Sequence, residues 1–134
     1  MTQPEREEVS ARAQARCEYC RYPELESLLP HQLDHVIAKQ HGGADDLSNL
    51  AFSCVLCNRY KGPNLSSVDP QTRSVVRLFN PRTQAWTEHF ALVEAKIEGL
   101  TPEGRATAFL LRFNEKVRIA ERLTLMQKGR WKVS

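Results

Sequence analysis

The sequence lacks any apolar run long enough to cross a membrane, because its longest uncharged apolar stretch falls far short of the roughly 20 residues that a spanning helix needs. Its first ten residues, MTQPEREEVS, are acidic and polar, whereas a signal peptide is basic and then apolar. Internal repeats and low-complexity segments are also lacking. These absences argue against a membrane or secreted protein, and we expect no membrane partner and a location in the cytoplasm.

The chain also has little net charge, +3 over 134 residues, but the charge is uneven. Residues 17–57 carry two basic and six acidic side chains, residues 58–82 five and one, and residues 102–134 eight and three. Clustered Arg and Lys suit contact with phosphate, although a solvated helix face is the simpler interpretation of the C-terminal run. With 41% hydrophobic residues, the composition predicts one globular domain, residues 1–134, with a modest core.

The sequence has no cysteine outside a C-x-x-C motif, because its four cysteines form two such motifs, Cys17/Cys20 and Cys54/Cys57. A redox motif or buried free thiols are the alternatives. Duplication of the pair and turn-like flanks favour a four-cysteine zinc site, since one tight turn presents two sulfurs and two turns complete a tetrahedron. Four thiolates leave no open coordination position, so such a zinc is structural and any catalysis must lie elsewhere.

The two pairs are separated by 33 residues, more than the roughly 15 to 20 of an ordinary zinc ribbon. A zinc ion bound by both pairs would therefore hold the two ends of residues 21–53 together, so that this segment forms a closed loop. Residues 31–37 read as a short strand, Gly42-Gly43 as a loop, and residues 45–52 as a turn followed by a second strand. A short helix over residues 58–61 follows, stopped by Gly62-Pro63.

Helices and further strands are expected on both sides of this core. Residues 4–16 have good helix composition, with acids at the N-terminal end. Residues 75–79 predict a strand, and residues 85–92 either pair with it or begin a helix. Thr101-Pro102 predicts a helix start. An amphipathic stripe that Asn114 interrupts is expected to pack in the core: Phe109, Phe113, Val117, Ala120 and Leu123.

The spaced elements Cys17-x-x-Cys20, Leu33-Asp34-His35-Val36-Ile37, Gly42-Gly43, Asn49-Leu50 and Cys54-x-x-Cys57-Asn58-x-x-Lys61-Gly62 together resemble the HNH family of endonucleases. The resemblance implies an α+β fold: a small ββα-metal finger over about residues 12–63, braced by a four-cysteine zinc site. A flanking N-terminal helix precedes it. A C-terminal extension over about residues 64–134 adds a strand pair and helices.

The residues themselves suit phosphodiester hydrolysis, which needs a base for water and a cation for the developing charge. His35 is the natural general base, because neutral imidazole accepts a proton near neutral pH. Asp34 and Asn58 supply oxygen ligands. Asn58 replaces the last His of the family pattern, and two oxygen ligands without imidazole favour Mg2+ or Mn2+ as the catalytic ion.

Other side chains have supporting roles in this prediction. Asn49, the middle N of the motif, can tie two backbone segments together and orient His35, or be an ordinary turn asparagine. Lys61 and Arg59 either contact phosphate or are solvated, and His41 is a candidate phosphate contact. His31 either touches substrate or is an edge-strand histidine. His89, outside the finger, is expected to be structural or at the surface.

The sequence thus predicts a metal-dependent HNH endonuclease that nicks or cuts DNA, with RNA as another possible substrate. No helix-turn-helix or other reading head is present, so low sequence specificity is expected. One finger offers one site to one strand, so a double-strand break would need a homodimer or two successive nicks. The alternative is a zinc-knuckle module that binds nucleic acid without catalysis. A regular strand would point Asp34 and His35 to opposite faces, yet both must serve one metal site, so we expect the strand to end or twist there.

Overall fold

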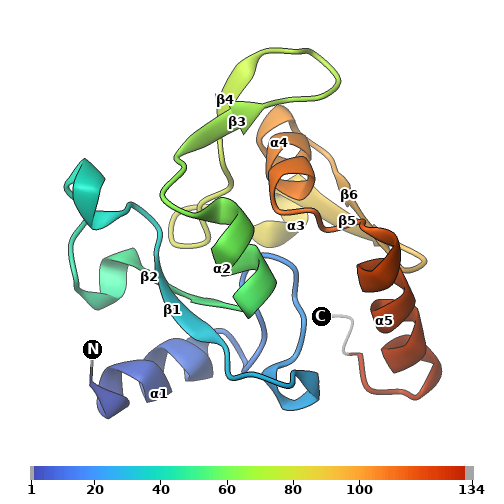
Figure 1. Ribbon diagram of the computed structural model, residues 1–134, viewed down its shortest axis with the longest axis horizontal. Coiled ribbons are helices and arrows are strands. Elements are labelled where there is room, and N and C mark those ends of the chain that lie inside the picture. The colour runs from blue at the N-terminus through green and yellow to red at the C-terminus, as the bar shows by residue number, and fades with distance from the viewer. Residues whose placement is uncertain (1, 132–134) are drawn as a thin grey trace.

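A computed structural model describes residues 2–131 as short helices and three two-stranded sheets (Figure 1). The elements in chain order are α1 (Gln3–Arg12), η1 (Glu24–Glu26), β1 (Gln32–His35), η2 (Lys39–His41), η3 (Leu47–Asn49), β2 (Leu50–Ser53), α2 (Val55–Lys61), β3 (Ser66–Val68), β4 (Val75–Arg77), α3 (Trp86–His89), β5 (Phe90–Val93), β6 (Lys96–Gly99), α4 (Pro102–Leu110) and α5 (Lys116–Gln127). Across residues 2–131, every helix is too short or too polar to span a bilayer.

Helix α1 begins with a capping box, in which Thr2 Oγ1 accepts a hydrogen bond from Glu5 N and the Glu5 carboxylate accepts one from Thr2 N. The helix ends at Arg12, four residues earlier than predicted. Gln14 and Ala15 both have a φ of 56°, a left-handed conformation that cannot continue a helix. The chain therefore turns here and enters the first cysteine pair.

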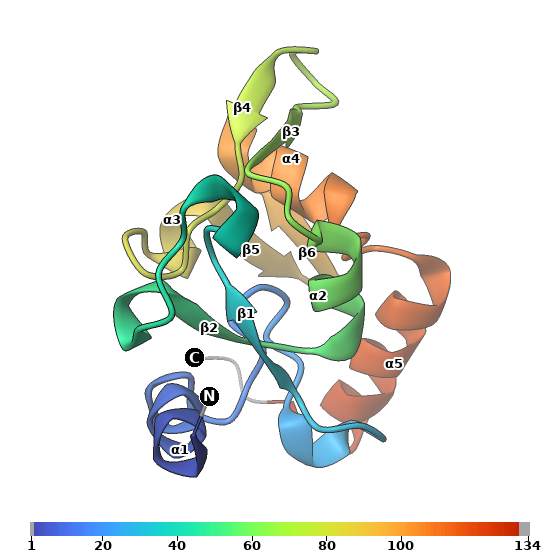
Figure 2. The ribbon, with the colours of Figure 1, turned by 60° about the vertical axis from the view of Figure 1, so that its left-hand side comes forward.

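The finger consists of β1, β2 and α2, which lie together in Figure 2. Strands β1 and β2 are antiparallel, with Asp34 opposite Ala51 and His35 opposite Leu50. The predicted order of strand, loop, strand and helix is confirmed, with the second cysteine pair at the corner between β2 and α2. Helix α2 starts earlier than predicted, at Val55, because Cys54 is its N-cap.

The strands of the extension pair differently from the prediction. Strand β4 pairs with β3, a strand that the sequence reading did not assign, and not with residues 85–92. Those residues form α3 and then β5, which pairs with β6. The helix alternative was therefore correct. The β3–β4 hairpin projects from the rest of the fold in both ribbon views (Figures 1 and 2).

The predicted core stripe of the C-terminal helices was wrong. Phe109, Val117 and Leu123 are exposed by 67%, 62% and 44%, whereas Phe113 is buried. The helix breaks between α4 and α5, so the spacing does not stay on one face. Asn114 lies in this break, where its amide hydrogen-bonds the backbone of Ile97 on β6. The buried face of α5 instead carries Arg118, Arg122 and Leu125.

One core joins the finger to the extension. It contains all four cysteines together with aromatic and aliphatic side chains from both parts of the chain: Tyr19, Val36, Ala51, Phe79, Phe90, Ile97, Leu111 and Phe113. A smaller cluster packs α1 against β2 through Val9, Ala13, Leu50 and Phe52. Residues 64–131 therefore cover the cysteine site and do not hang free of it.

Candidate metal centre and active site

The four cysteines lie in two turns whose backbone is shaped around sulfur. In the first turn, Cys17 Sγ accepts hydrogen bonds from Tyr19 N and Cys20 N, each at 3.4 Å. In the second, Cys54 Sγ accepts one from Cys57 N at 3.4 Å. Such N–H donors stabilise thiolate charge, which is the form of cysteine that binds metal.

The arrangement of the sulfurs fits a tetrahedral zinc. All four are buried, and their sulfur atoms lie within 4.8 Å of one another. The Sγ atoms of Cys20 and Cys54 are 3.7 Å apart, close to the edge of about 3.8 Å that four Zn–S bonds of about 2.3 Å give in a tetrahedron. These residues are therefore positioned for a zinc ion.

Charge also favours a cation at this place. Burial raises the pKa of the Cys17 and Cys57 thiols well above the usual value. Burial acts in the same direction on Cys20, but hydrogen bonds from the neighbouring cysteines outweigh it and lower the pKa of that thiol. Four buried thiolates need positive charge beside them, which a divalent ion supplies.

His35, at the end of β1, has a side chain only 17% exposed. Its Nε2 lies 2.7 Å from Asp45 Oδ1, and Lys39 Nζ lies 3.2 Å from the same oxygen. The hydrogen bond from His35, followed by that from Lys39, lowers the pKa of Asp45. Sequence reasoning did not assign Asp45 a role in the site. The only signal was an acid close behind the glycine pair.

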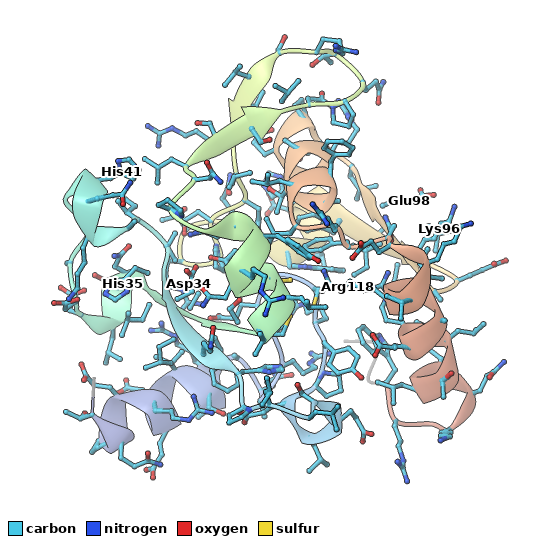
Figure 3. The ribbon with its side chains drawn as sticks, in the orientation of Figure 1. Asp34, His35, His41, Lys96, Glu98 and Arg118 are labelled. Carbon is cyan, nitrogen blue, oxygen red and sulfur yellow. The ribbon has the colours of Figure 1, made fainter. Side chains whose placement is uncertain are left out.

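Asp34, the neighbour of His35, points to the other side of β1 and contacts α2 (Figure 3). Its Oδ2 accepts a hydrogen bond from the Tyr19 hydroxyl at 2.7 Å and lies 3.2 Å from Lys61 Nζ. Burial raises the pKa of Asp34, while the Lys61 ammonium and the Tyr19 hydroxyl act in the opposite direction. The divergence of Asp34 and His35 is the alternation of an ordinary strand.

Asn58 lies one helical turn before Lys61 on α2. It donates a hydrogen bond from Nδ2 to Gln32 Oε1 on β1. Strand and helix thus meet in two adjacent pairs, Gln32 with Asn58 and Asp34 with Lys61, which places the two predicted oxygen ligands on facing elements. Asp34 and Asn58 have the donor chemistry of a hard cation. Among residues 2–131, the group of three or more His, Cys, Asp or Glu side chains that lies close enough to hold a metal ion is the four cysteines.

Asn49, which is buried, joins the two ends of the loop between β1 and β2. Its Oδ1 accepts a hydrogen bond from Ile37 N at 2.9 Å, and its Nδ2 donates to Ile37 O at 2.9 Å and to Ala44 O at 2.8 Å. Gly43 permits this close approach, because a Cβ there would lie 1.7 Å from Ile37 O. The asparagine thus fixes the loop that carries Asp45.

The remaining predicted residues divide by exposure. Arg59 and His41 are at the surface, and His41 borders a cavity of about 400 Å³ between the finger and the β3–β4 hairpin. Lys61 is 2% exposed, and its ammonium faces Asp34 and the carbonyl of His35. Two histidines are structural: His31 is buried with Nε2 at 2.8 Å from Tyr22 O, and His89 is buried with Nδ1 at 2.6 Å from Thr101 Oγ1.

The structure thus holds a ββα finger with His35 on one side of its first strand, Asp34 on the other, and four cysteines positioned for zinc at its base. Residues 17–64 match the family model described as HNH endonuclease. This match confirms the suspected HNH family for the segment that holds both cysteine pairs, Asp34, His35, Asn49 and Asn58. Comparisons with curated proteins and with solved structures gave no match.

Proposed function

We propose that this protein is a divalent-metal-dependent endonuclease that hydrolyses phosphodiester bonds of DNA. The observation that supports this most directly is His35 held by Asp45, within the HNH segment and on the strand whose other side carries Asp34. A structural histidine would be expected to bond to backbone or core groups, as His31 does. The His35 ring instead pairs with the carboxylate of Asp45, which is exposed at the protein surface.

His35 acts as the general base in this proposal. With its Nε2 hydrogen directed to Asp45 Oδ1, the ring has a lone pair at Nδ1 that can take a proton from water. Asp45 fixes the tautomer and the ring orientation and stabilises the imidazolium that forms. Asn49 positions both by holding the loop that connects them.

Asp34 and Asn58 hold Mg2+ or Mn2+ in this proposal, and the four cysteines hold a structural Zn2+. When bound, the catalytic ion supplies positive charge to the scissile phosphate and the leaving oxygen. Because Asp34 faces α2 and His35 faces Asp45, this role requires the end of β1 to turn so that both side chains reach one phosphate. Lys61 balances the charge of Asp34 from 3.2 Å, and the divalent cation would share that role or take it over.

Arg59 and His41 are the proposed surface contacts for the phosphate backbone, and Lys61 supports them from within. Such contacts read no bases, so cleavage would be weakly dependent on sequence. Each chain would nick one strand, and a double-strand break would need two copies or two nicks. DNA is the proposed substrate, and cleavage of RNA is tested in parallel.

The test is conversion of supercoiled plasmid to open circles by zinc-loaded protein with Mg2+ or Mn2+. We expect His35→Ala to lower the rate by about 100-fold or more, the typical contribution of a general base. Asp45→Asn keeps the loop and should lower it less. Equal rates for the native protein and His35→Ala would exclude His35 as the base. Robust cleavage with zinc alone and none with magnesium or manganese would exclude the proposed catalytic ion.

One observation favours the alternative, a zinc-knuckle module that binds nucleic acid without catalysis. The buried Lys61 ammonium already compensates Asp34, as in a purely structural ion pair. A titration with Mn2+ separates the two hypotheses. If the protein is a nuclease, the Asp34→Ala variant should bind one Mn2+ ion fewer than the native protein. Identical Mn2+ binding by the native and variant proteins, together with retained nucleic-acid binding, would favour the silent module.

A further inference from the structure

Arg118 belongs to α5, far outside the segment that matches the HNH family, yet it reaches the cysteine site (Figure 3). It is 5% exposed, and its guanidinium lies near the Phe113 ring, 5.9 Å from the ring centroid. A buried arginine is costly unless its donors and its charge are both matched. The groups around Arg118 show how this cost is met.

The two ends of the guanidinium contact different parts of the fold. Nη2 lies 3.3 Å from Cys57 Sγ and 3.8 Å from Cys54 Sγ. Nη1 donates to Leu111 O at 2.7 Å and lies 3.3 Å from Arg112 O, both in the joint between α4 and α5. One side chain therefore connects the second cysteine pair to the break in the C-terminal helices.

The hydrogen bonds to sulfur are unevenly shared. Cys17 accepts two from backbone amides and Cys54 accepts one. Within the described part of the chain, the donor that reaches Cys57 Sγ is Arg118. Its thiolate thus takes its stabilising donor from a residue 61 positions further along the chain.

The negative charge of the zinc site explains why a cationic side chain is favourable here. Four thiolates around one divalent ion leave a net charge of −2 in a buried region, and one guanidinium halves it. Arginine suits the position, because its fixed fork can donate to sulfur on one side and to carbonyl oxygens on the other. A lysine has one point of charge and cannot span both.

We propose that Arg118 is a positioning residue of the zinc centre, which holds the Cys57 thiolate and fastens α5 to the finger. Hydrogen-bond partners outside the ligand shell commonly change metal affinity by about 10- to 100-fold. Arg118 would thereby make the C-terminal extension part of the metal site. This proposal goes beyond the nuclease function and does not depend on it.

The test measures zinc and not cleavage. Zinc-loaded native protein, Arg118→Met and Arg118→Lys are mixed with a chromogenic chelator, and the rate of zinc release is recorded. We expect release to be about 10- to 100-fold faster from Arg118→Met, with Arg118→Lys between the two. The Co2+-substituted proteins give a second readout, because losing the donor to Cys57 should shift the sulfur-to-cobalt charge-transfer band.

Arg122 provides a matched control. It is also a buried arginine of α5, but its contacts are with Ala95 O, Phe113 O and Asn114 Oδ1. Arg122→Met should lower stability while leaving the charge-transfer band in place and zinc release within about threefold of native. Native-like release and spectrum in Arg118→Met, or equal acceleration in Arg122→Met, would overturn the proposal. If Arg118→Met does not fold, Arg118→Lys decides by the same two readouts.

Discussion

At the residue scale, Lys61 and Asp34 form the most buried ion pair of opposite charges in the finger, with side chains exposed by 2% and 6%. Removing one partner of such a pair leaves an unpaired charge away from water, whereas removing both charges can be nearly neutral. We expect Lys61→Met to lower the free energy of unfolding by about 3 kcal/mol or more. Asp34→Asn/Lys61→Met should lose less than Lys61→Met alone. Urea unfolding of the zinc-loaded proteins at pH 7 measures both.

Lys39 is the control for this cycle. It also pairs with a carboxylate, Asp45, but its side chain is 67% exposed, and an exposed pair contributes about 0 to 1 kcal/mol. Lys39→Met should therefore unfold almost as the native protein does. A loss under about 1 kcal/mol for Lys61→Met, or a larger loss for Asp34→Asn/Lys61→Met than for Lys61→Met alone, would contradict a stabilising buried pair.

Spacing in the sequence predicts ligands but not their partners. The four cysteines were assigned to a shared metal site from two short motifs, since each motif fixes its own turn. Asp45, Tyr19 and Arg118 were not connected to the site, because each reaches it through a loop or an element whose path the sequence does not state. The strand was expected to end or twist so that Asp34 and His35 face one site. Strand β1 does end at His35, but the two side chains still diverge as in an ordinary strand.

At the element scale, the finger was predictable and the extension only in part. Turn residues and cysteines mark the finger at short intervals. In the extension, β3 carries the weak pattern Ser66-Ser67-Val68, and the helical stripe continues through a break that depends on Arg112, with a φ of 56°. Periodicity alone cannot detect that break, so exposed Phe109 and Val117 were expected in the core.

The β3–β4 hairpin is anchored by Asp69, whose buried carboxylate accepts hydrogen bonds from Arg105 Nε at 3.0 Å and Nη2 at 2.9 Å on α4. Arg105 holds the pKa of Asp69 below its ordinary value. As pH falls, the unfolded chain therefore takes up the proton first. The stabilisation is complete above the unfolded pKa of about 4 and is lost below it.

This pair gives a pH-dependent prediction. Asp69→Asn should unfold at lower urea concentration than the native protein, by a margin that stays constant from pH 8 to pH 5. The margin should shrink only below about pH 4, where the Asp69 carboxyl becomes protonated in the unfolded chain while it is still ionised in the folded protein. Urea titrations of the zinc-loaded proteins at each pH measure it. A margin that stays constant below pH 4 would show that folding does not lower the pKa of Asp69.

At the scale of the whole molecule, the first cysteine turn is the meeting point of distant segments. The Trp86 indole N–H donates to Tyr19 O at 2.8 Å, and Arg82 pairs with Glu18. Near the C-terminal end, the Trp131 ring packs edge-on against Tyr22 at 6.3 Å. Both tryptophans of the chain therefore contact residues within or beside this turn.

Removal of zinc should therefore unfold the finger and the extension together. A structural zinc contributes on the order of 10 kcal/mol, as much as the whole net stability of a small domain. A strong chelator should red-shift the tryptophan emission and reduce the far-UV circular dichroism in one shared transition, and added Zn2+ should reverse both. If the emission of both tryptophans stays native after the metal is shown to be gone, the cysteine site does not hold the extension in place, and the shared core alone does so.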